Sequence, residues 1–354
     1  MDERFRAICD APGVSGFEDA VQAVVADLVR PVVDELWRDR MGNLIALKRA
    51  RPGVASPRRL AYAAHVDEIG MMVSHVDEAG FVRFRAVGGL DPRALPSQRV
   101  TVHASRGDGG ALSGVIATQS GWLGTPADRE RVFPIPELYV DLGRPGDEVR
   151  ALVEVGDVIT FAAGVEALSD RVWVGHNFDD RIGVYCLVEA MRRLAAAELD
   201  VDVYAVFTAQ EEVGVRGMPT AAHAIAADIA VALDGSLPSD TPYARPHERQ
   251  CALGHGTGIY LMDNRTIGTP RLVRGLIDTC ERHGIAYQRN LGGGTDASEI
   301  QRHGLGAWAT TIGAPVRYMH STVQLCHADD VEATTALLVA FAGEAAGLLP
   351  DDWR

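Results

Sequence analysis

Two adjacent glutamates, Glu211 and Glu212, are the residues whose type and position most directly indicate chemistry. They follow a run of β-branched and aromatic residues, Val201-Asp-Val-Tyr-Ala-Val-Phe207, which predicts a buried strand. Two carboxylates at the end of such a strand repel each other and lose hydration unless a cation or a shared proton compensates. Since an isolated Glu-Glu pair is most often a solvated turn, the pair gains meaning only if other segments repeat the arrangement.

Four other segments of the chain do repeat it. One apolar run ends at His65 and another ends at Asp234. A third run is followed after a short loop by His320, and a fourth precedes Asp179 and Asp180 at the start of a helical pattern. Because ligands bind beyond the carboxyl ends of the strands in an open α/β sheet, we expect these side chains to gather at one edge.

The gathered side chains offer nitrogen and oxygen ligands, which suit ions such as zinc and cobalt. A single catalytic zinc ion needs only about three protein ligands, so the supply exceeds what one ion requires. It fits two ions about 3.5–4 Å apart that share a carboxylate, with the remaining glutamate acting as general base. Spacing alone does not decide between Glu211 and Glu212, because neighbouring side chains on a strand face opposite ways.

Two different sequence patterns indicate the elements that must position these residues. Strand and helix signals alternate in residues 1–69 and again in residues 165–354, which predicts an α/β domain with a mostly parallel sheet flanked by helices. Residues 70–164 contain short β-rich pieces separated by Gly, Pro and Asp turns, and they lack a convincing long helix. We therefore expect a small β-rich domain inserted into the catalytic α/β domain.

The motifs around the candidate residues are specific in sequence and in order. They read His65-Val-Asp67-Glu-Ile-Gly70, Phe178-Asp179-Asp180-Arg181-Ile-Gly183, Thr208-Ala-Gln-Glu211-Glu212-Val-Gly214 and Arg317-Tyr318-Met-His320-Ser321. In this order they resemble the M42 family of metallo-aminopeptidases, which includes the TET and the glutamyl aminopeptidases, and the resemblance runs along nearly the whole chain. It implies the same two-part layout, with a zinc-exopeptidase-like α/β domain and an inserted β-barrel or PDZ-like domain.

The resemblance also implies roles for individual residues. Two divalent ions per subunit, zinc or cobalt, would be held by His65, Asp179, Glu212, Asp234 and His320. Asp179 would bridge the ions, and Glu211 would be the catalytic base. Asp67 lies two residues from His65, on the same face of an extended chain. It is expected to accept the second ring N–H of that histidine, as a supporting catalytic residue.

These observations favour an aminopeptidase that removes N-terminal residues from short peptides with metal-activated water. A dinuclear amidohydrolase or deacylase acting on small acylated substrates would use much the same ligands. A metal-binding assembly protein without activity is the third interpretation, but it would have no need of Glu211. Neither the glycine-rich segments nor Gly13-Val-Ser15-Gly16 matches a nucleotide-binding motif or a serine nucleophile elbow.

Composition limits the partners and the setting. The net charge of −14 argues against nucleic acid and anionic membranes as partners. Five scattered cysteines without a Cys-x-x-Cys pair indicate neither a disulfide framework nor a thiolate zinc site. The first residues lack the features of a signal peptide, and the apolar stretch at 333–343 is too short to span a bilayer. A cytoplasmic enzyme is the simplest interpretation.

The resemblance further implies a homo-oligomer, a dodecamer built from dimers, with residues 70–164 serving dimerisation and assembly. Within them, residues 121–136 form a long irregular stretch bounded by prolines. Trp122, Leu123, Phe133 and Ile135 are its candidates for an exposed apolar surface, and such surfaces usually mark contacts. We expect this stretch to line the substrate entrance of a neighbouring subunit.

Overall fold

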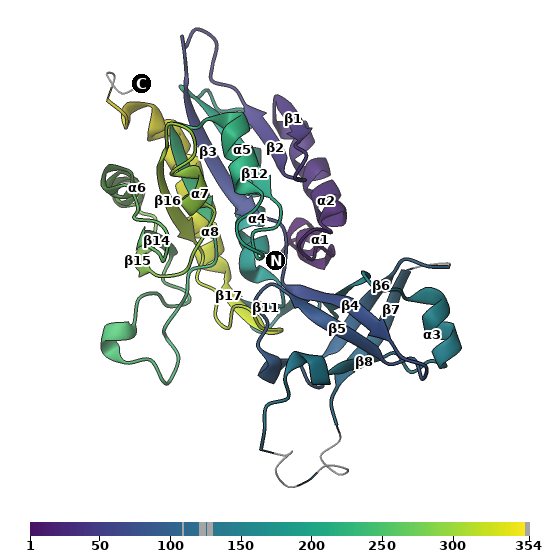
Figure 1. The fold of residues 1–354 in the computed structure, drawn as a ribbon. Coiled ribbons are helices and arrows are strands. Elements are labelled where there is room, and N and C mark those ends of the chain that lie inside the picture. The colour runs from purple at the N-terminus through teal and green to yellow at the C-terminus, as the bar shows by residue number, and fades with distance from the viewer. Residues whose placement is uncertain (108–109, 120–124, 126–129, 351–354) are drawn as a thin grey trace.

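The computed structural model describes residues 1–107, 110–119, 125 and 130–350. Its largest element is a mixed sheet of eight strands in the order β1-β2-β12-β3-β13-β16-β14-β15 (Figure 1). In that order the strands are Glu35–Arg38, Leu44–Lys48, Val201–Thr208, Arg58–His65, Ile229–Leu233, Trp308–Gly313, Thr257–Met262 and Tyr287–Leu291.

The centre of this sheet is parallel. Strand β3 pairs in parallel with β12 and with β13, and β13 pairs in parallel with β16. Strands β1 and β2 are antiparallel additions at one side, and β14 runs antiparallel to β16 at the other. In the central register His65 lies opposite Thr208, and Leu233 lies opposite Ile312. The carboxyl ends of four strands are thereby aligned at one edge, as a mostly parallel sheet requires.

Helices cover both faces of the sheet, and the alternation along β3 shows why. Leu60, Tyr62 and Ala64 belong to one buried apolar cluster, whereas Ala61 and Ala63 belong to another. The first cluster is completed by α1 (Glu3–Asp10), α2 (Asp19–Val29), α4 (Phe178–Leu194), α6 (Pro270–His283) and α8 (Ala328–Glu344). The second is completed by α5 (Met218–Ile225) and α7 (Ala297–Ile300). Both faces are apolar because both are covered.

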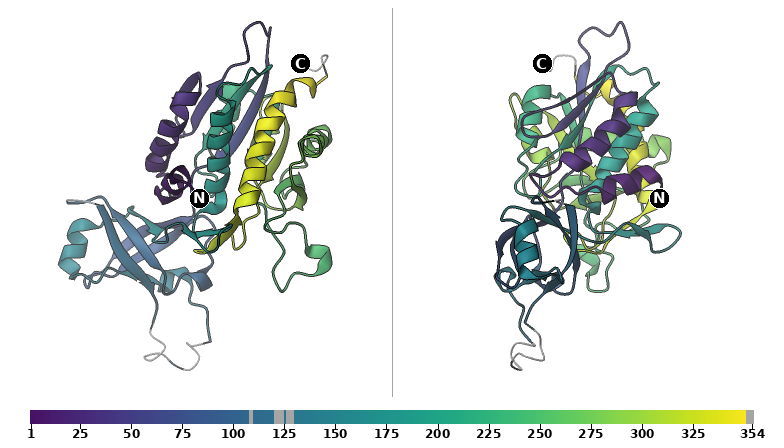
Figure 2. Two further views of the ribbon diagram at one scale, coloured as in Figure 1. Left: turned by 180° about the vertical axis from the view of Figure 1, so that it is seen from behind. Right: turned by 90° about the vertical axis from the view of Figure 1, so that its right-hand side faces the viewer.

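A closed barrel of six strands lies beyond the carboxyl edge of the sheet (Figures 1 and 2). Its strands, in the order β4-β5-β8-β7-β6-β9, are Gly70–Val76, Val82–Val87, Tyr139–Asp141, Gly110–Ala117, Arg99–Ala104 and Val158–Phe161. They enclose an apolar core of their own, and the short helix α3 (Gly146–Leu152) packs on it through Val149 and Leu152. Helix α3 is not among the elements expected from the sequence, because its seven residues are too few to show a helical period.

A third sheet and several short turns complete the fold. Strands β10 (Glu166–Ala167), β11 (Val172–Gly175) and β17 (Gln324–His327) form a three-stranded antiparallel sheet. The apolar run before Asp179, residues 172–174, is expected from the sequence to belong to the large sheet, and this expectation is wrong, because β11 pairs with β10 and β17 instead. Single turns of 3-10 helix occur at Arg30–Val32, Pro92–Ala94, Ile135–Glu137, Pro246–Glu248 and Ala345–Gly347.

Three further sequence expectations concern the cysteines, membrane-spanning helices and an exposed apolar surface. All five cysteines are free and buried. Among the described residues, no helix combines the length and the apolar character that a membrane span needs. Phe133 and Ile135 are half-buried against the barrel core, so these two are not the exposed apolar surface expected of them. Trp122 and Leu123 lie outside the described residues.

Candidate metal centre

Two groups of side chains that could each hold a metal ion meet at the aligned strand ends. One group is His65, Asp179 and Asp234, and the other is Asp179, Glu212 and His320. Within each group the ligand atoms lie within 4.8 Å of one another. Asp179 belongs to both groups, so the structure brings together all five residues that the family resemblance assigned to metal binding.

Different elements supply these ligands. His65 is the last residue of β3, and Asp234 directly follows β13. The last residue of β16, Gly313, leaves no room for a side chain, because a Cβ there would lie 1.7 Å from the carbonyl oxygen of Asp234. Glu212 lies in the loop after β12, and His320 lies in the loop before β17 with a left-handed backbone (φ +57°).

Asp179 reaches the site from the first turn of α4, and the peptide bond that joins it to the following residue, Asp180, is cis. Its Oδ1 atom lies 3.2 Å from Nε2 of His65, and its Oδ2 atom lies 3.2 Å from Nε2 of His320. Its backbone N–H donates to Oε1 of Gln324 on β17 (2.9 Å). The small sheet therefore positions the shared carboxylate through β17. Asp179 reaches the site in this way although β11, the strand that precedes it, is not part of the large sheet.

The site carries more negative charge than its own residues compensate. Burial, with Asp296 and other carboxylates nearby, raises the pKa of Glu211 well above its ordinary value. Burial and the charge of Asp179 raise the pKa of Glu212 to about 8 and that of Asp234 well above the ordinary range. Although burial alone would lower it, the pKa of His65 is raised by hydrogen bonds to Asp179 and Asp67. Such a site favours cations.

Two buried carboxylate oxygens without hydrogen-bond partners also indicate a site that favours cations. Among the described residues, Oδ2 of Asp180 and Oδ1 of Asp296 are buried without a hydrogen-bond partner, which is costly for a carboxylate. Oδ1 of Asp180 accepts the N–H of Gly183 (3.1 Å), as expected of a carboxylate at a helix start. Imidazole and carboxylate donors, arranged around one shared carboxylate, fit a pair of divalent ions.

Glu211 and Asp67 lie beside the ligands without belonging to either group. The Asp67 carboxylate accepts the backbone N–H of Glu211 at Oδ1 (2.9 Å) and that of Glu212 at Oδ2 (3.1 Å). Nδ1 of His65 lies 3.1 Å from the backbone carbonyl oxygen of Asp67 and 3.6 Å from its Oδ1. The nearest contact of Nδ1 is thus the backbone, whereas the carboxylate accepts hydrogen bonds from the two glutamate amides and from the Ser15 hydroxyl (2.6 Å).

Sequence reasoning missed four residues whose side chains hydrogen-bond to the site and to the loop before it: Gln324 to Asp179, Ser15 to Asp67, Glu18 to Gln210 and Asn43 to Ala209. Each acts on a backbone group or on another side chain, so no spacing rule identifies them. His327, seven residues after His320, accepts the N–H of Asp329 at Nδ1 and caps α8.

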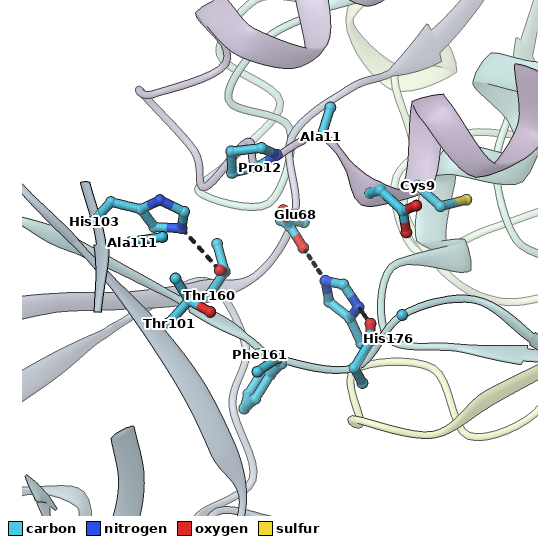
Figure 3. A pocket seen from close by; sticks show the side chains of 14 residues that line it. Cys9, Ala11, Pro12, Glu68, Thr101, His103, Ala111, Thr160, Phe161 and His176 are labelled. Carbon is cyan, nitrogen blue, oxygen red and sulfur yellow. Dashed lines mark hydrogen bonds and ion pairs between the residues drawn. The ribbon is translucent and has the colours of Figure 1, made fainter. Parts of the chain in front are cut away.

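The two cavities that the structure shows most clearly lie away from the ligands. One, of about 460 Å³, lies beside Glu68, whose Oε2 is 2.8 Å from Nε2 of His176 (Figure 3). His103 and Phe161 of the barrel also line it (Figure 3). The other, of about 1370 Å³, surrounds Arg58, Asp228 and Trp308 at the opposite ends of the strands. No metal ligand lines either cavity.

A family model described as M42 glutamyl aminopeptidase matches residues 42–337. This chain belongs to the M42 peptidase family. It is 31% identical over 353 residues to the lysyl aminopeptidase of Pyrococcus furiosus, covering 97% of this chain and 96% of that one. The fold matches the TET aminopeptidase of a marine sediment archaeon, Thaumarchaeota archaeon SCGC AB-539-E09, with a TM-score of 0.91 at 31% identity. That match covers 96% of this chain and 95% of the other.

The M42 chain also matches the TET1 peptidase of Pyrococcus horikoshii, with a TM-score of 0.85 at 31% identity, covering 97% of this chain and 99% of that one. That peptidase can assemble into a tetrahedron or a large octahedral shell. These findings confirm the family and the fold that the motifs indicated, and they establish the chain as an enzyme of the peptidase class.

Proposed function

We propose that this M42 enzyme is a dinuclear metal aminopeptidase that removes N-terminal residues from short peptides. The observation that carries the proposal is the pair of ligand groups sharing Asp179, with the half-buried Glu211 beside them and outside both. Its named relatives support the peptide substrate, since they include a lysyl and a glutamyl aminopeptidase.

Two divalent ions, zinc or cobalt, fit the donor set. His65 and Asp234 would serve one ion, Glu212 and His320 would serve the other, and Asp179 would bridge them. Bound there, the ions supply Lewis-acid polarisation of the scissile carbonyl and lower the pKa of water. The residues of the chain have to orient the peptide and move the proton.

Glu211 is the residue we assign to proton transfer. A general base needs a pKa near the operating pH, and burial raises the pKa of Glu211 in that direction. It would take a proton from the attacking water and give it to the departing amine. The Asp67 carboxylate fixes the backbone of Glu211 and Glu212 together, so the base and one ligand keep their relative position.

We further propose that residues 1–69 and 165–354 form the catalytic domain and that residues 70–164 serve dimerisation and assembly. The closed barrel supports this division because it has a core of its own. The TET1 peptidase of similar fold forms large shells, which supports a homo-oligomer, a dodecamer of dimers, for this chain. The five free, buried cysteines suit a reducing, cytoplasmic setting.

A deacylase acting on small acylated substrates is the second candidate, because the ligand set would serve it equally well. The metal-loaded enzyme should be given short peptides with a free N-terminus and the same peptides after N-acetylation, with release of the first residue measured by mass spectrometry. An aminopeptidase cleaves the free peptides and leaves the acetylated ones intact. Preferential release of acetate would replace the proposal with the deacylase.

A further inference from the structure

We propose that Ser15 and Glu18 are positioning residues for catalysis, holding the loop that carries Glu211. The loop consists of residues 209–212 and is called the glutamate loop below. The segment 13–18 is called the N-terminal turn. The inference rests on the proposed role of Glu211 as the base, and it assigns the Gly13-Val-Ser15-Gly16 motif a task in that reaction.

The glutamate loop has no strand or helix to bind its amide groups. Instead, four successive backbone N–H groups donate to side-chain oxygens. These bonds run from Ala209 to Oδ1 of Asn43 (2.9 Å), from Gln210 to Oε1 of Glu18 (3.1 Å), from Glu211 to Oδ1 of Asp67 (2.9 Å) and from Glu212 to Oδ2 of Asp67 (3.1 Å). Three of the four bonds end on a carboxylate, and hydrogen bonds to charged acceptors are the stronger kind.

The N-terminal turn supplies one of these acceptors and orients another. Ser15 donates its hydroxyl to Oδ2 of Asp67 (2.6 Å), so the rotation of that carboxylate is fixed from a second side. Oε1 of Glu18 accepts the N–H of Gly16 (2.7 Å) in addition to that of Gln210. Both Ser15 (7% exposed) and Glu18 (6% exposed) are buried, so water does not compete for these contacts.

The turn is itself attached to the segment that follows β3. The N–H of Gly13 donates to Oε1 of Glu68 (3.0 Å), and the N–H of Glu68 donates back to the carbonyl oxygen of Gly13 (2.9 Å). Asp67 belongs to the same segment, and His65 is the last residue of β3 directly before it. The N-terminal turn, one metal ligand and the glutamate loop therefore form one hydrogen-bonded unit.

The backbone of the glutamate loop needs such support. Gln210 adopts a left-handed conformation (φ +58°) directly before Glu211, and a residue other than glycine keeps that conformation only where its surroundings impose it. If the bonds to Glu18 and Asp67 loosen, Gln210 can relax and Glu211 moves. Misplacing a catalytic group by about 1 Å can cost roughly 100-fold in rate.

The test compares Ser15→Ala, Ser15→Cys, Glu18→Ala and Glu18→Gln in the full, metal-loaded enzyme. Ser15→Ala and Glu18→Ala should lower kcat by roughly 10- to 100-fold, while KM and the metal content per chain stay as in the wild type. Ser15→Cys keeps the size with a weaker donor and should fall between wild type and Ser15→Ala. Glu18→Gln keeps an oxygen acceptor and should retain most of kcat.

A matched control exists in the barrel. Ser105 donates its hydroxyl to Oε1 of Glu154 (2.8 Å) at an exposed position, so Ser105→Ala and Glu154→Ala remove a serine–carboxylate hydrogen bond within residues 70–164. Neither should change kcat. Thermal unfolding of every variant shows whether a loss of rate follows a loss of folded protein, and the graded series at Ser15 and the rescue by Glu18→Gln separate positioning from general stability.

The outcomes distinguish this proposal from the one it rests on. If Glu211→Gln abolishes turnover while Ser15→Ala and Glu18→Ala keep wild-type kcat, the N-terminal turn has no positioning role and Glu211 remains the base. If Glu211→Gln stays active, the assignment of Glu211 as the base is wrong, and the positioning role of Ser15 and Glu18 that rests on it is wrong as well. Equal losses of kcat in Ser105→Ala, or a fall in metal content in the Ser15 and Glu18 variants, would also overturn the positioning role.

Discussion

Replacing Asp179 with asparagine removes the one carboxylate that both ligand groups share. The amide has nearly the same shape, so the backbone contact with Gln324 and the packing of α4 should persist. Each ion would keep its two remaining ligands, His65 with Asp234 and Glu212 with His320. Because an amide is neutral and bridges dications poorly, we expect both ions to bind more weakly.

The size of the loss follows from the charges. A divalent cation and a carboxylate 4 Å apart interact by about 8 kcal/mol at an effective dielectric constant of 20, twice the value for two unit charges. If the remaining ligands and water recover about three quarters of this, about 2 kcal/mol is lost for each ion, which is roughly a 30-fold weaker Kd. The loss should appear at both ions, since Oδ1 faces His65 and Oδ2 faces His320, each at 3.2 Å.

The assay is metal analysis of wild type and variant after dialysis at a series of buffered free-metal concentrations, with isothermal titration for the affinities. Asp180→Asn is the matched control, because Asp180 is the neighbouring buried carboxylate and belongs to neither ligand group. We expect weakened binding only for Asp179→Asn. Two ions held with wild-type affinity in that variant would refute the bridge, and loss of binding in Asp180→Asn would assign the bridge to that residue.

The remaining predictions concern the two ions, the pH and the assembly. His65→Ala and Asp234→Ala should each weaken one ion preferentially, whereas Glu212→Ala and His320→Ala weaken the other; calorimetry that shows the same ion lost in all four variants would contradict this division. In the metal-free protein, burial and Asp179 raise the pKa of Glu212 to about 8, and the hydrogen bond to Asp179 raises that of His320 to about 9. Both groups therefore hold protons at about pH 7 that a metal ion must displace, so affinity should increase from about pH 7 to about pH 9 in chelator competition, and a flat profile would show that these groups do not ligate. Light scattering should give a mass many times that of the 38.0 kDa chain, and a fully active monomer would remove the assembly proposal while leaving the two-metal chemistry intact.

The gathering of candidate ligands at one edge of the sheet could be predicted because strand ends are visible in a sequence. His65 and Asp234 lie at the ends of apolar runs, and the parallel register of β3, β12, β13 and β16 brings such positions together. A β-rich insert could be anticipated from short β-rich pieces between turns. Both inferences depend on local patterns that hydrophobic periodicity and turn residues carry, whereas the role of each ligand and the barrel came from the family resemblance.

Other features depend on pairing that no local pattern encodes. Strand β11 reads as part of the large sheet, yet it pairs with β17, about 150 residues later in the chain. The contacts of Ser15 and Glu18 with the glutamate loop likewise join residues far apart in sequence. For the same reason, Phe133 and Ile135 looked exposed in sequence, because the barrel core against which they pack is formed by distant strands.

Glu211→Gln tests the proposed chemistry most directly, because it removes the base without removing a metal ligand. Metal content and turnover of a short free-amine peptide should be measured on the same purified sample. We expect two divalent ions per chain, as in the wild type, and a kcat lower by roughly 10²- to 10⁴-fold, the usual contribution of general base catalysis. A variant that binds both ions and keeps near-wild-type turnover would contradict the assignment of Glu211 as the base.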